Sequence, residues 1–442
     1  MTDEVEIATL GAQGDGVTAA GVFVPRTLPG ERVRLTPEEG DPARRTPAAI
    51  LRPAPCRITP VCRHFEDCGG CTLQHADAPT VAAFKRDLVA SALSAAGVTP
   101  GTVRQTLTIP AASRRRIALA ARRTRSGVLI GFRGQRAETI VPITDCAVIT
   151  PGLAAVLPRL APLVEALASR KGTLRLTLTE TEGGIDCAAT GAKPLDPPKA
   201  QSAPRHRRAK RPGGAATFSP DAEALRRDLA AMAEALDLAR LTVEDETLAA
   251  RRPACLTLGP ARVPLPPGAF LQPSAAGAMA LTRLVQEALG PAAEGGPLVD
   301  LFAGVGTFAL PLSAAAPVTA YELDAPAVDA LTTAWRTAAP MAGLRRLEGV
   351  VRNLFRRPVL ATELKGIAGA VIDPPFAGAA EQARALAEST VPRIASVSCN
   401  PATFARDAAL LAAGGYVLDW VQPVDQFRWS AHVEVIGAFR RP

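Results

Sequence analysis

Short apolar runs alternate with loops and helical patterns through the C-terminal part of the chain. Four runs have the length of buried strands, at residues 298–302, 318–322, 369–372 and 394–397. A glycine-containing stretch follows the first run at 303–308, and the apolar residues 309–315 then predict a helix. Strands that alternate with helices in this way form parallel sheets covered on both faces. We therefore predict an α/β domain with a doubly wound sheet over residues 266–442.

The first 52 residues have a different pattern, in which apolar and polar residues alternate over short runs. Val5-Glu6-Ile7 and Arg32-Val33-Arg34-Leu35 are examples, and glycines separate the runs at positions 11, 14, 16, 30 and 40. Short alternating strands with glycine turns are typical of small β-barrels. We predict an OB-like β-barrel over residues 1–52.

Residues 53–265 predict a central α+β domain. An amphipathic helix is expected at 79–97, ended by Gly97. A hairpin with an Arg-rich edge follows at 113–133, and a helix with a β-pair is expected within 151–190. Residues 191–216 are basic and rich in Pro and Gly, and they predict an exposed loop because like charges repel.

Composition places the protein among soluble globular chains, with 48% hydrophobic and 21% charged residues over 442 positions. Its net charge is +8, and only 6 of its 50 basic residues are Lys. Arg binds phosphates and bases better than Lys does, so the balance mildly favours a nucleic-acid partner. The acidic N-terminus lacks the apolar core of a signal peptide. The uncharged run at 301–320 is interrupted by Gly and Pro, which favours a soluble loop over a membrane span. We expect a cytoplasmic monomer without membrane contact.

Four of the eight cysteines lie between positions 56 and 71. The C-x5-C-x2-C spacing of Cys62, Cys68 and Cys71 brings three thiolates within reach of one metal centre, because Gly69 and Gly70 allow a tight turn. Zinc sites and cubane clusters both need a fourth ligand, for which Cys56 and Cys146 are candidates. The spacing alone selects neither the fourth ligand nor the metal.

The glycine loop at 303–308 predicts a nucleoside-binding site. Gly304 and Gly306 lack a Cβ, so the backbone can approach a ligand there, and Glu322 ends the next strand, where a carboxylate can accept ribose hydroxyls. The third glycine typical of dinucleotide sites is missing. We therefore predict S-adenosylmethionine rather than NAD as the cofactor.

Three groups with possible catalytic roles follow predicted strands of this domain. Asp373 follows the run 369–372, Cys399 follows 394–397, and Glu434 lies in a final strand predicted at 430–437. In an open α/β sheet, strand ends of this kind meet in one crevice. The predicted site therefore combines a thiol nucleophile, a base and a polar group beside the cofactor.

These motifs together resemble the class I RNA 5-methyluridine methyltransferases over essentially the whole chain. The segment Gly14-Asp15-Gly16-Val17 resembles a TRAM domain, and with the cysteine cluster it favours the bacterial 23S ribosomal RNA branch. The motifs that carry the resemblance are Asp300-Leu301-Phe302-Ala303-Gly304-Val305-Gly306, Asp373-Pro374-Pro375, Ser398-Cys399-Asn400-Pro401 and His432-Val433-Glu434.

The resemblance implies a Rossmann-like methyltransferase domain that methylates C5 of a uridine, most simply in 23S rRNA. It implies a [4Fe-4S] cluster on Cys62, Cys68, Cys71 and Cys146, which leaves Cys56 outside the cluster. The implied cofactor contacts are Gln272, Phe302, Gly304, Gly306, Thr307, Glu322, Asn353 and Asp373. Cys399 would be the nucleophile that adds to C6 of the uracil, and Glu434 would be the base that removes the C5 proton.

The chain departs from the family pattern at three positions. Phe376 replaces an Arg that commonly follows Asp-Pro-Pro, Ala303 replaces a frequent Cys, and Thr307 replaces a frequent Asn. The alternatives are a tRNA 5-methyluridine methyltransferase, a 5-methylcytidine enzyme and a non-catalytic iron–sulfur RNA-binding factor. The Pro-Cys arrangement usual in the cytidine enzymes is missing, and the pair Cys399 and Glu434 argues against a non-catalytic role.

Overall fold

The computed structural model describes residues 4–36, 41, 43–196 and 220–442. Most of the basic stretch predicted as a loop at 191–216 therefore lies outside the described residues. The chain divides into two compact units, one formed by Met1–Arg114 with Leu256–Pro442 and the other by Arg115–Cys255.

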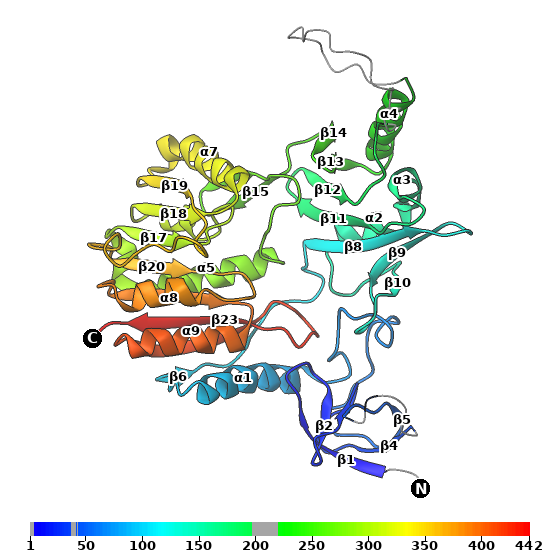
Figure 1. Cartoon of the computed structure of the whole chain (residues 1–442), viewed down its shortest axis with the longest axis horizontal. Coiled ribbons are helices and arrows are strands. Elements are labelled where there is room, and N and C mark those ends of the chain that lie inside the picture. Colours follow the sequence, from blue (N-terminus) through cyan, green and yellow to red (C-terminus); the bar gives the residue numbers. More distant parts are fainter. Residues whose placement is uncertain (1–3, 37–40, 42, 197–219) are drawn as a thin grey trace, which may run out of the picture. The chain divides into compact units, whose positions relative to one another are not determined.

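The first unit is organised around a mixed sheet in which β17, β18, β19, β20 and β21 run parallel (Figure 1). The antiparallel strand β23 lies beside β21, and β22 pairs with β23. The sheet order is β19-β18-β17-β20-β21-β23-β22-β6, and β7 also pairs with β22. The bounds are β6 (Thr102–Val103), β7 (Leu107–Thr108), β17 (Leu298–Leu301), β18 (Val318–Glu322), β19 (Leu347–Val351), β20 (Gly369–Ile372), β21 (Arg393–Ser398), β22 (Val417–Asp425) and β23 (Glu434–Arg440).

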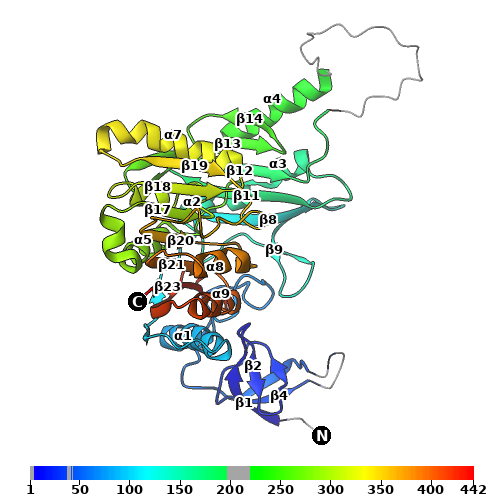
Figure 2. The ribbon, with the colours of Figure 1, turned by 60° about the vertical axis from the view of Figure 1, so that its left-hand side comes forward.

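Helices bury both faces of this sheet. Apolar residues of α5 (Ala275–Leu289), α6 (Ala309–Leu312) and α7 (Ala325–Ala342) pack against one face. Those of α1 (Ala78–Ala95), α8 (Ala380–Ala387) and α9 (Pro401–Ala413) pack against the other, and Figure 2 shows α8, α9 and α1 in succession. Strands covered on both faces must be apolar throughout, which explains their unbroken hydrophobic runs.

The N-terminal residues of the same unit form a five-stranded antiparallel sheet in the order β3-β2-β1-β4-β5. Its small core consists of Ile7, Val24, Val33 and Leu35. A two-stranded hairpin, β15 (Cys255–Leu258) with β16 (Ala261–Pro264), precedes α5. The bounds of the N-terminal strands are β1 (Glu4–Leu10), β2 (Gly16–Thr18), β3 (Phe23–Val24), β4 (Arg32–Leu35) and β5 (Pro47–Arg52).

The second unit is a seven-stranded sheet in the order β10-β9-β8-β11-β12-β13-β14, with α2, α3 and α4. Neighbouring strands are antiparallel except for the parallel pair β12 and β13. The bounds are β8 (Arg116–Arg123), β9 (Val128–Arg133), β10 (Ile140–Pro142), α2 (Pro151–Val156), α3 (Ala161–Leu167), β11 (Leu174–Thr181), β12 (Gly184–Thr190), α4 (Pro220–Ala235), β13 (Leu238–Val243) and β14 (Glu246–Ala250). The short 3-10 helices are Leu157–Arg159 in this unit and Gly290–Glu294 in the first.

The predicted strands of the α/β domain are present, with corrected ends. The final strand begins at Glu434 instead of 430, because Ser430 Oγ accepts the His432 N–H and folds the preceding residues into a turn. The helix predicted at 309–315 ends at Leu312. The helix predicted at 79–97 spans Ala78–Ala95, and Gly97 follows it with φ +70°. Among the described helices, none is long and apolar enough to span a membrane.

Candidate active site

Cys399 lies between the end of β21 and the start of α9. The strand is buried on both faces, and Asn400 ends it by capping the helix: its Oδ1 accepts the Ala402 N–H over 3.0 Å. Pro401 suits the first helical position because it lacks the N–H that would otherwise be unpaired there. The thiol is half-buried. The N-terminal end of a helix carries partial positive charge, which favours a thiolate at this position.

Glu434 lies opposite Cys399 across an antiparallel strand pair. Ser398 on β21 pairs with Val435 on β23, so one further step of the same register brings Cys399 and Glu434 together. Glu434 is buried, with 2% of its surface exposed. The sheet therefore places the predicted nucleophile and the predicted base at the same edge.

A chain of side-chain hydrogen bonds connects Glu434 with the second buried carboxyl, Asp373. Gln272 Nε2 donates to Asp373 Oδ2 over 3.0 Å. Gln426 Nε2 donates to Gln272 Oε1 over 2.8 Å and to Glu434 Oε2 over 2.7 Å. The two N–H groups of Gln426 therefore serve two acceptors, and this sets the orientation of both amides.

Burial dominates the electrostatics of this site. It raises the pKa of Asp373 to about 7, against a smaller lowering by the Gln272 hydrogen bond. Burial, followed by the Asp373 charge, raises the pKa of Glu434 well above its usual value, although the Gln426 bond lowers it. Burial and the charges of Glu434 and Asp373 raise the pKa of the Cys399 thiol to about 12. Because like charges in one buried site repel, these three groups are not all ionised together near neutral pH.

The glycine loop after β17 begins with a backbone that few side chains adopt. Phe302 has φ +67°, Gly304 φ +54° and Gly306 φ +95°. A Cβ at Gly306 would lie 2.3 Å from Leu331 Cδ1, so this position needs a glycine for space as well as conformation. The bulky Phe302 in a left-handed conformation indicates local strain, which proteins concentrate at functional sites.

Two acidic side chains, Asp300 and Glu322, accept hydrogen bonds from the backbone of this loop and of the helix that follows it. Asp300 Oδ2 accepts the Ala309 N–H at the start of α6 over 2.9 Å. Burial, then the charge of Asp373, raises the pKa of Asp300 to about 8. Glu322 Oε2 accepts the Gly304 N–H over 2.9 Å, and its Oε1 accepts the N–H groups of Leu323 and Asp324. A carboxylate has about four acceptor positions, so Glu322 keeps capacity for a further donor such as a ribose hydroxyl.

Asn353 follows β19, and its side chain caps its own turn. Its Oδ1 accepts the N–H groups of Phe355 and Arg356, each over 3.1 Å. The Phe355 ring lies 5.4 Å from the Phe302 ring, measured between centroids, so this turn adjoins the glycine loop. Thr307 is half-buried within that loop, and its carbonyl accepts the Thr282 hydroxyl over 3.4 Å.

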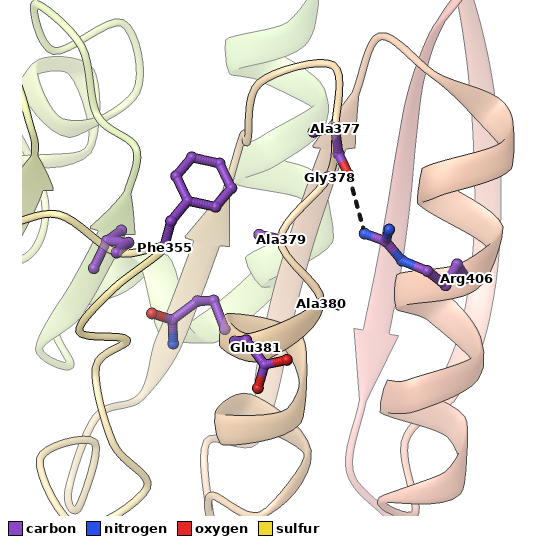
Figure 3. Close-up of a pocket in the computed structure, with 9 residues that line it drawn as sticks. Phe355, Ala377, Gly378, Ala379, Ala380, Glu381 and Arg406 are labelled. Carbon is purple, nitrogen blue, oxygen red and sulfur yellow. Dashed lines mark hydrogen bonds between the residues drawn. The ribbon is translucent and has the colours of Figure 1, made fainter.

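A shallow pocket of about 250 Å³ lies beside Phe355. Figure 3 shows the Phe355 ring on one side and Arg406, which donates to the Ala377 carbonyl, on the other. Asp373, Cys399 and Glu434 are not among the lining residues. The pocket therefore contains none of the three predicted catalytic groups.

The predicted metal ligands belong to different units: Cys62, Cys68 and Cys71 to the first, and Cys146 to the second. All four thiols are half-buried and form no disulfide. Cys68 Sγ accepts the Gly70 N–H over 3.4 Å, a contact that also stabilises thiolates. Within the described parts of the chain, no three His, Cys, Asp or Glu side chains form a group ready to hold a metal.

Gln426 is the functional residue that sequence reasoning missed. A single Gln after a strand has no motif around it, and its partners are 8 and 154 positions away. Pairing of β22 with β23 brings it to Glu434, and burial of Gln272 completes the contact. Of the predicted site residues, the structure brings Cys399, Glu434, Asp373 and Gln272 together near the strand ends.

The fold and the site define a class I methyltransferase domain with a cysteine at a strand end. The tRNA (uracil-54, C5)-methyltransferase of Pyrococcus abyssi has the same fold, with a TM-score of 0.69 and 22% identity over 99% of both chains. No protein-family model matches the sequence.

Curated relatives are similar over the full length. An uncharacterized RNA methyltransferase of Caulobacter vibrioides is 42% identical over 99% of this chain and 100% of the relative. The 23S rRNA (uracil(1939)-C(5))-methyltransferase RlmD of Halomonas elongata is 32% identical over 99% of this chain and 89% of the relative. The chain therefore belongs to the family of RNA 5-methyluridine methyltransferases, and it is an RNA methyltransferase.

Proposed function

We propose that this enzyme transfers the methyl group of S-adenosylmethionine to C5 of one uridine in RNA. The observation that carries the proposal is the antiparallel register that sets Cys399 opposite Glu434 at the open edge of a class I methyltransferase sheet. A thiol and a carboxyl are the two groups that C5 methylation of uracil requires from a protein.

Uracil C5 is a weak nucleophile, and addition of Cys399 to the ring makes it a stronger one. Its Sγ forms a bond to C6, and the electron pair moves to make C5 carbanion-like. When bound beside the strand ends, S-adenosylmethionine supplies an electrophilic methyl group on a sulfonium. After methylation of C5, Glu434 removes the C5 proton, the C6–Sγ bond breaks, and Cys399 leaves as a thiolate. The target uridine must leave its stack to reach both groups.

Glu434 must be ionised when it takes the proton. Burial and Asp373 oppose ionisation, whereas the N–H of Gln426 favours it. Cys399 must also lose its proton before attack. Protonation of one nearby carboxyl, and the N-terminal end of α9, make this loss easier. One of the two carboxyls can therefore remain protonated while the other is ionised, because the reaction needs only one negative carboxylate at a time.

The glycine loop fits the nucleoside of the methyl donor. Gly304, Gly306, Phe302 and Thr307 form the loop, and Glu322 can accept ribose hydroxyls. We assign the remaining contacts to Asn353 beside the loop, and to Gln272 and Asp373 between cofactor and base. The Phe302 and Phe355 rings add apolar surface next to the loop.

We assign the substrate to ribosomal RNA. The support is the 32% identity with a relative named as a 23S rRNA enzyme, since it extends over 99% of this chain. The N-terminal sheet, which we interpret as a TRAM-like RNA-binding module, adds basic side chains such as Arg32, Arg34 and Arg52 on its strands.

We also propose that Cys62, Cys68, Cys71 and Cys146 hold a [4Fe-4S] cluster. The donor set supports this, because four thiols without oxygen ligands suit iron–sulfur or zinc binding. The mechanism above needs no electron, so the cluster has no step in it. Anaerobic purification with iron, zinc and sulfide analysis tests the assignment; a zinc-only protein would overturn it.

A methyl-transfer assay tests the function. Wild-type protein with labelled S-adenosylmethionine is incubated with 23S rRNA fragments or tRNA transcripts, and the product is mapped by mass spectrometry. We expect 5-methyluridine in 23S rRNA; methylation of tRNA alone would refute the ribosomal assignment. Cys399→Ala should abolish transfer, whereas the matched variant Cys255→Ala, at a buried cysteine in β15, should retain it. An active Cys399→Ala protein would contradict the mechanism.

A further inference from the structure

The turn between β22 and β23, residues 426–433, carries the group that positions Glu434. We call it the active-site turn. Gln426 begins it and donates to Glu434, which follows the turn as the first residue of β23. A displacement of this turn therefore changes the distance between the base and its hydrogen-bond donor.

The active-site turn is bonded to residues that directly follow Cys71. The Trp429 carbonyl accepts the N–H groups of both Thr72 and Leu73, each over 2.8 Å. Two donors use both lone pairs of that carbonyl. Trp429 has φ +59°, a conformation that bulky residues adopt only when their surroundings impose it.

A second anchor comes from α1. Lys85 Nζ donates to Asp425 Oδ1 and, over 3.2 Å, to the Phe427 carbonyl. The Lys85 side chain is fully buried, so water does not compete for these contacts. One ammonium group thus holds the residues on both sides of Gln426.

A small apolar cluster joins these parts. Leu73 is fully buried in it, and Ala431 of the active-site turn packs against it. The cluster consists of Leu28, Ala54, Leu73, Ala76, Val81 and Phe84. We call residues 56–75 the cysteine segment. Two hydrogen bonds and an apolar contact therefore join the active-site turn to this segment.

We propose that the cysteine segment positions the active-site turn. Metal binding or release at the thiols of this segment is then transmitted to Glu434 through Thr72, Leu73 and Trp429. The inference rests on the proposed function for the role of Glu434. The competing role for the segment is an RNA-binding surface only, which would affect RNA affinity and leave the turn unchanged.

Hydrogen exchange measured by mass spectrometry tests the proposal on the full-length protein. Leu73→Val is compared with Leu28→Val, its matched control, because both leucines are fully buried in the same cluster. The backbone N–H of Leu73 also donates to the turn, so the loss of packing around Leu73 loosens a residue that holds the turn, whereas Leu28 makes no such bond. We expect Leu73→Val to speed exchange in residues 426–433 by about tenfold, with kcat lowered and the KM for RNA unchanged. Leu28→Val should leave exchange in the turn at the wild-type rate.

Where iron and zinc analysis shows that the purified wild-type protein holds a metal, its removal by a chelator gives a second measurement that needs no substitution. Exchange should rise in residues 56–75 and 426–433 and stay constant in β17 and α7. Unchanged exchange in 426–433, or equal increases in both leucine variants or across β17 and α7, would overturn the proposal. Exchange requires no substrate, so it decides this inference even if RNA methylation fails in the assay above.

Discussion

Gln426 donates an N–H to Glu434 over 2.7 Å in a site that also contains Asp373. The bond can stabilise only an acceptor oxygen, so it favours the ionised form of Glu434. The Oε1 atom of Gln426 is buried without a hydrogen-bond partner among the described residues. An unpaired buried oxygen costs about 1–3 kcal/mol, which indicates that the orientation of this amide serves the two acceptors.

This relationship predicts a pH dependence for Gln426→Met. Glu434 must be ionised to accept the C5 proton, so kcat rises with pH through its raised pKa. Loss of the Gln426 bond raises that pKa further, and the acid limb of the kcat profile should move to higher pH. The rate at neutral pH should fall by about tenfold. The matched control is Gln422→Met on β22, because Gln422 takes no part in the hydrogen bonds that connect Glu434 with Asp373. If the acid limb of the kcat profile stays at the wild-type pH in Gln426→Met, the prediction is wrong.

Glu434→Gln should trap a covalent complex. The amide cannot take the C5 proton, so elimination of Cys399 is blocked after methylation. An RNA–protein adduct should accumulate, visible as a band of reduced mobility on a denaturing gel. The double variant Cys399→Ala with Glu434→Gln is the control and should give no adduct. If the adduct also forms in the double variant, Cys399 is not the nucleophile.

The same substitution should make Cys399 more reactive. Burial and the charges of Glu434 and Asp373 raise the pKa of the thiol to about 12, so wild-type Cys399 is almost fully protonated near pH 8. Removing one negative charge lowers this pKa, and alkylation by iodoacetamide should accelerate several-fold, about threefold to tenfold. The peptide that contains Cys399 is followed by mass spectrometry. Glu348→Gln, at an exposed acid of β19, should react at the wild-type rate.

Asp300 predicts a pH-dependent stability. Its folded-state pKa is about 8, above the unfolded value near 3.8, so the folded state binds more protons between these values. The free energy of unfolding therefore falls as pH rises from the unfolded-state pKa to the folded-state pKa. Below the unfolded-state pKa, Asp300 is protonated in both states and has no such effect. Asp300→Asn removes the cost of ionisation. Relative to wild type, its free energy of unfolding should change little near pH 4 and rise by about 1–3 kcal/mol near pH 9.

Denaturant unfolding at the two pH values checks this expectation. A constant difference between Asp300→Asn and wild type across pH would show that Asp300 does not change its protonation over this range. Asp324, which is exposed at the N-terminus of α7, offers the control Asp324→Asn, which removes a carboxyl outside the buried site.

Local sequence was sufficient where a strand end and its chemistry are adjacent in the chain. Cys399 follows an apolar run and precedes a helix-capping Asn-Pro pair, so its position was predictable without the fold. The glycines at 304 and 306 were predictable for the same reason, since their positive φ angles are a property of the loop itself. The start of β23 was less well predicted, because a hydrogen bond within the preceding turn delays the strand until Glu434.

The sequence by itself determined the sheet class, the glycine loop and the presence of a thiol and an acid at strand ends, because each depends on residues close together in the chain. Only the tertiary structure decided which acid faces Cys399, that Gln426 and Gln272 together connect the two buried carboxyls, and that the Trp429 carbonyl accepts the N–H groups of Thr72 and Leu73. These contacts join residues separated by up to several hundred positions. They arise from strand pairing and burial, which strengthen a hydrogen bond by excluding water and leave no trace in local periodicity.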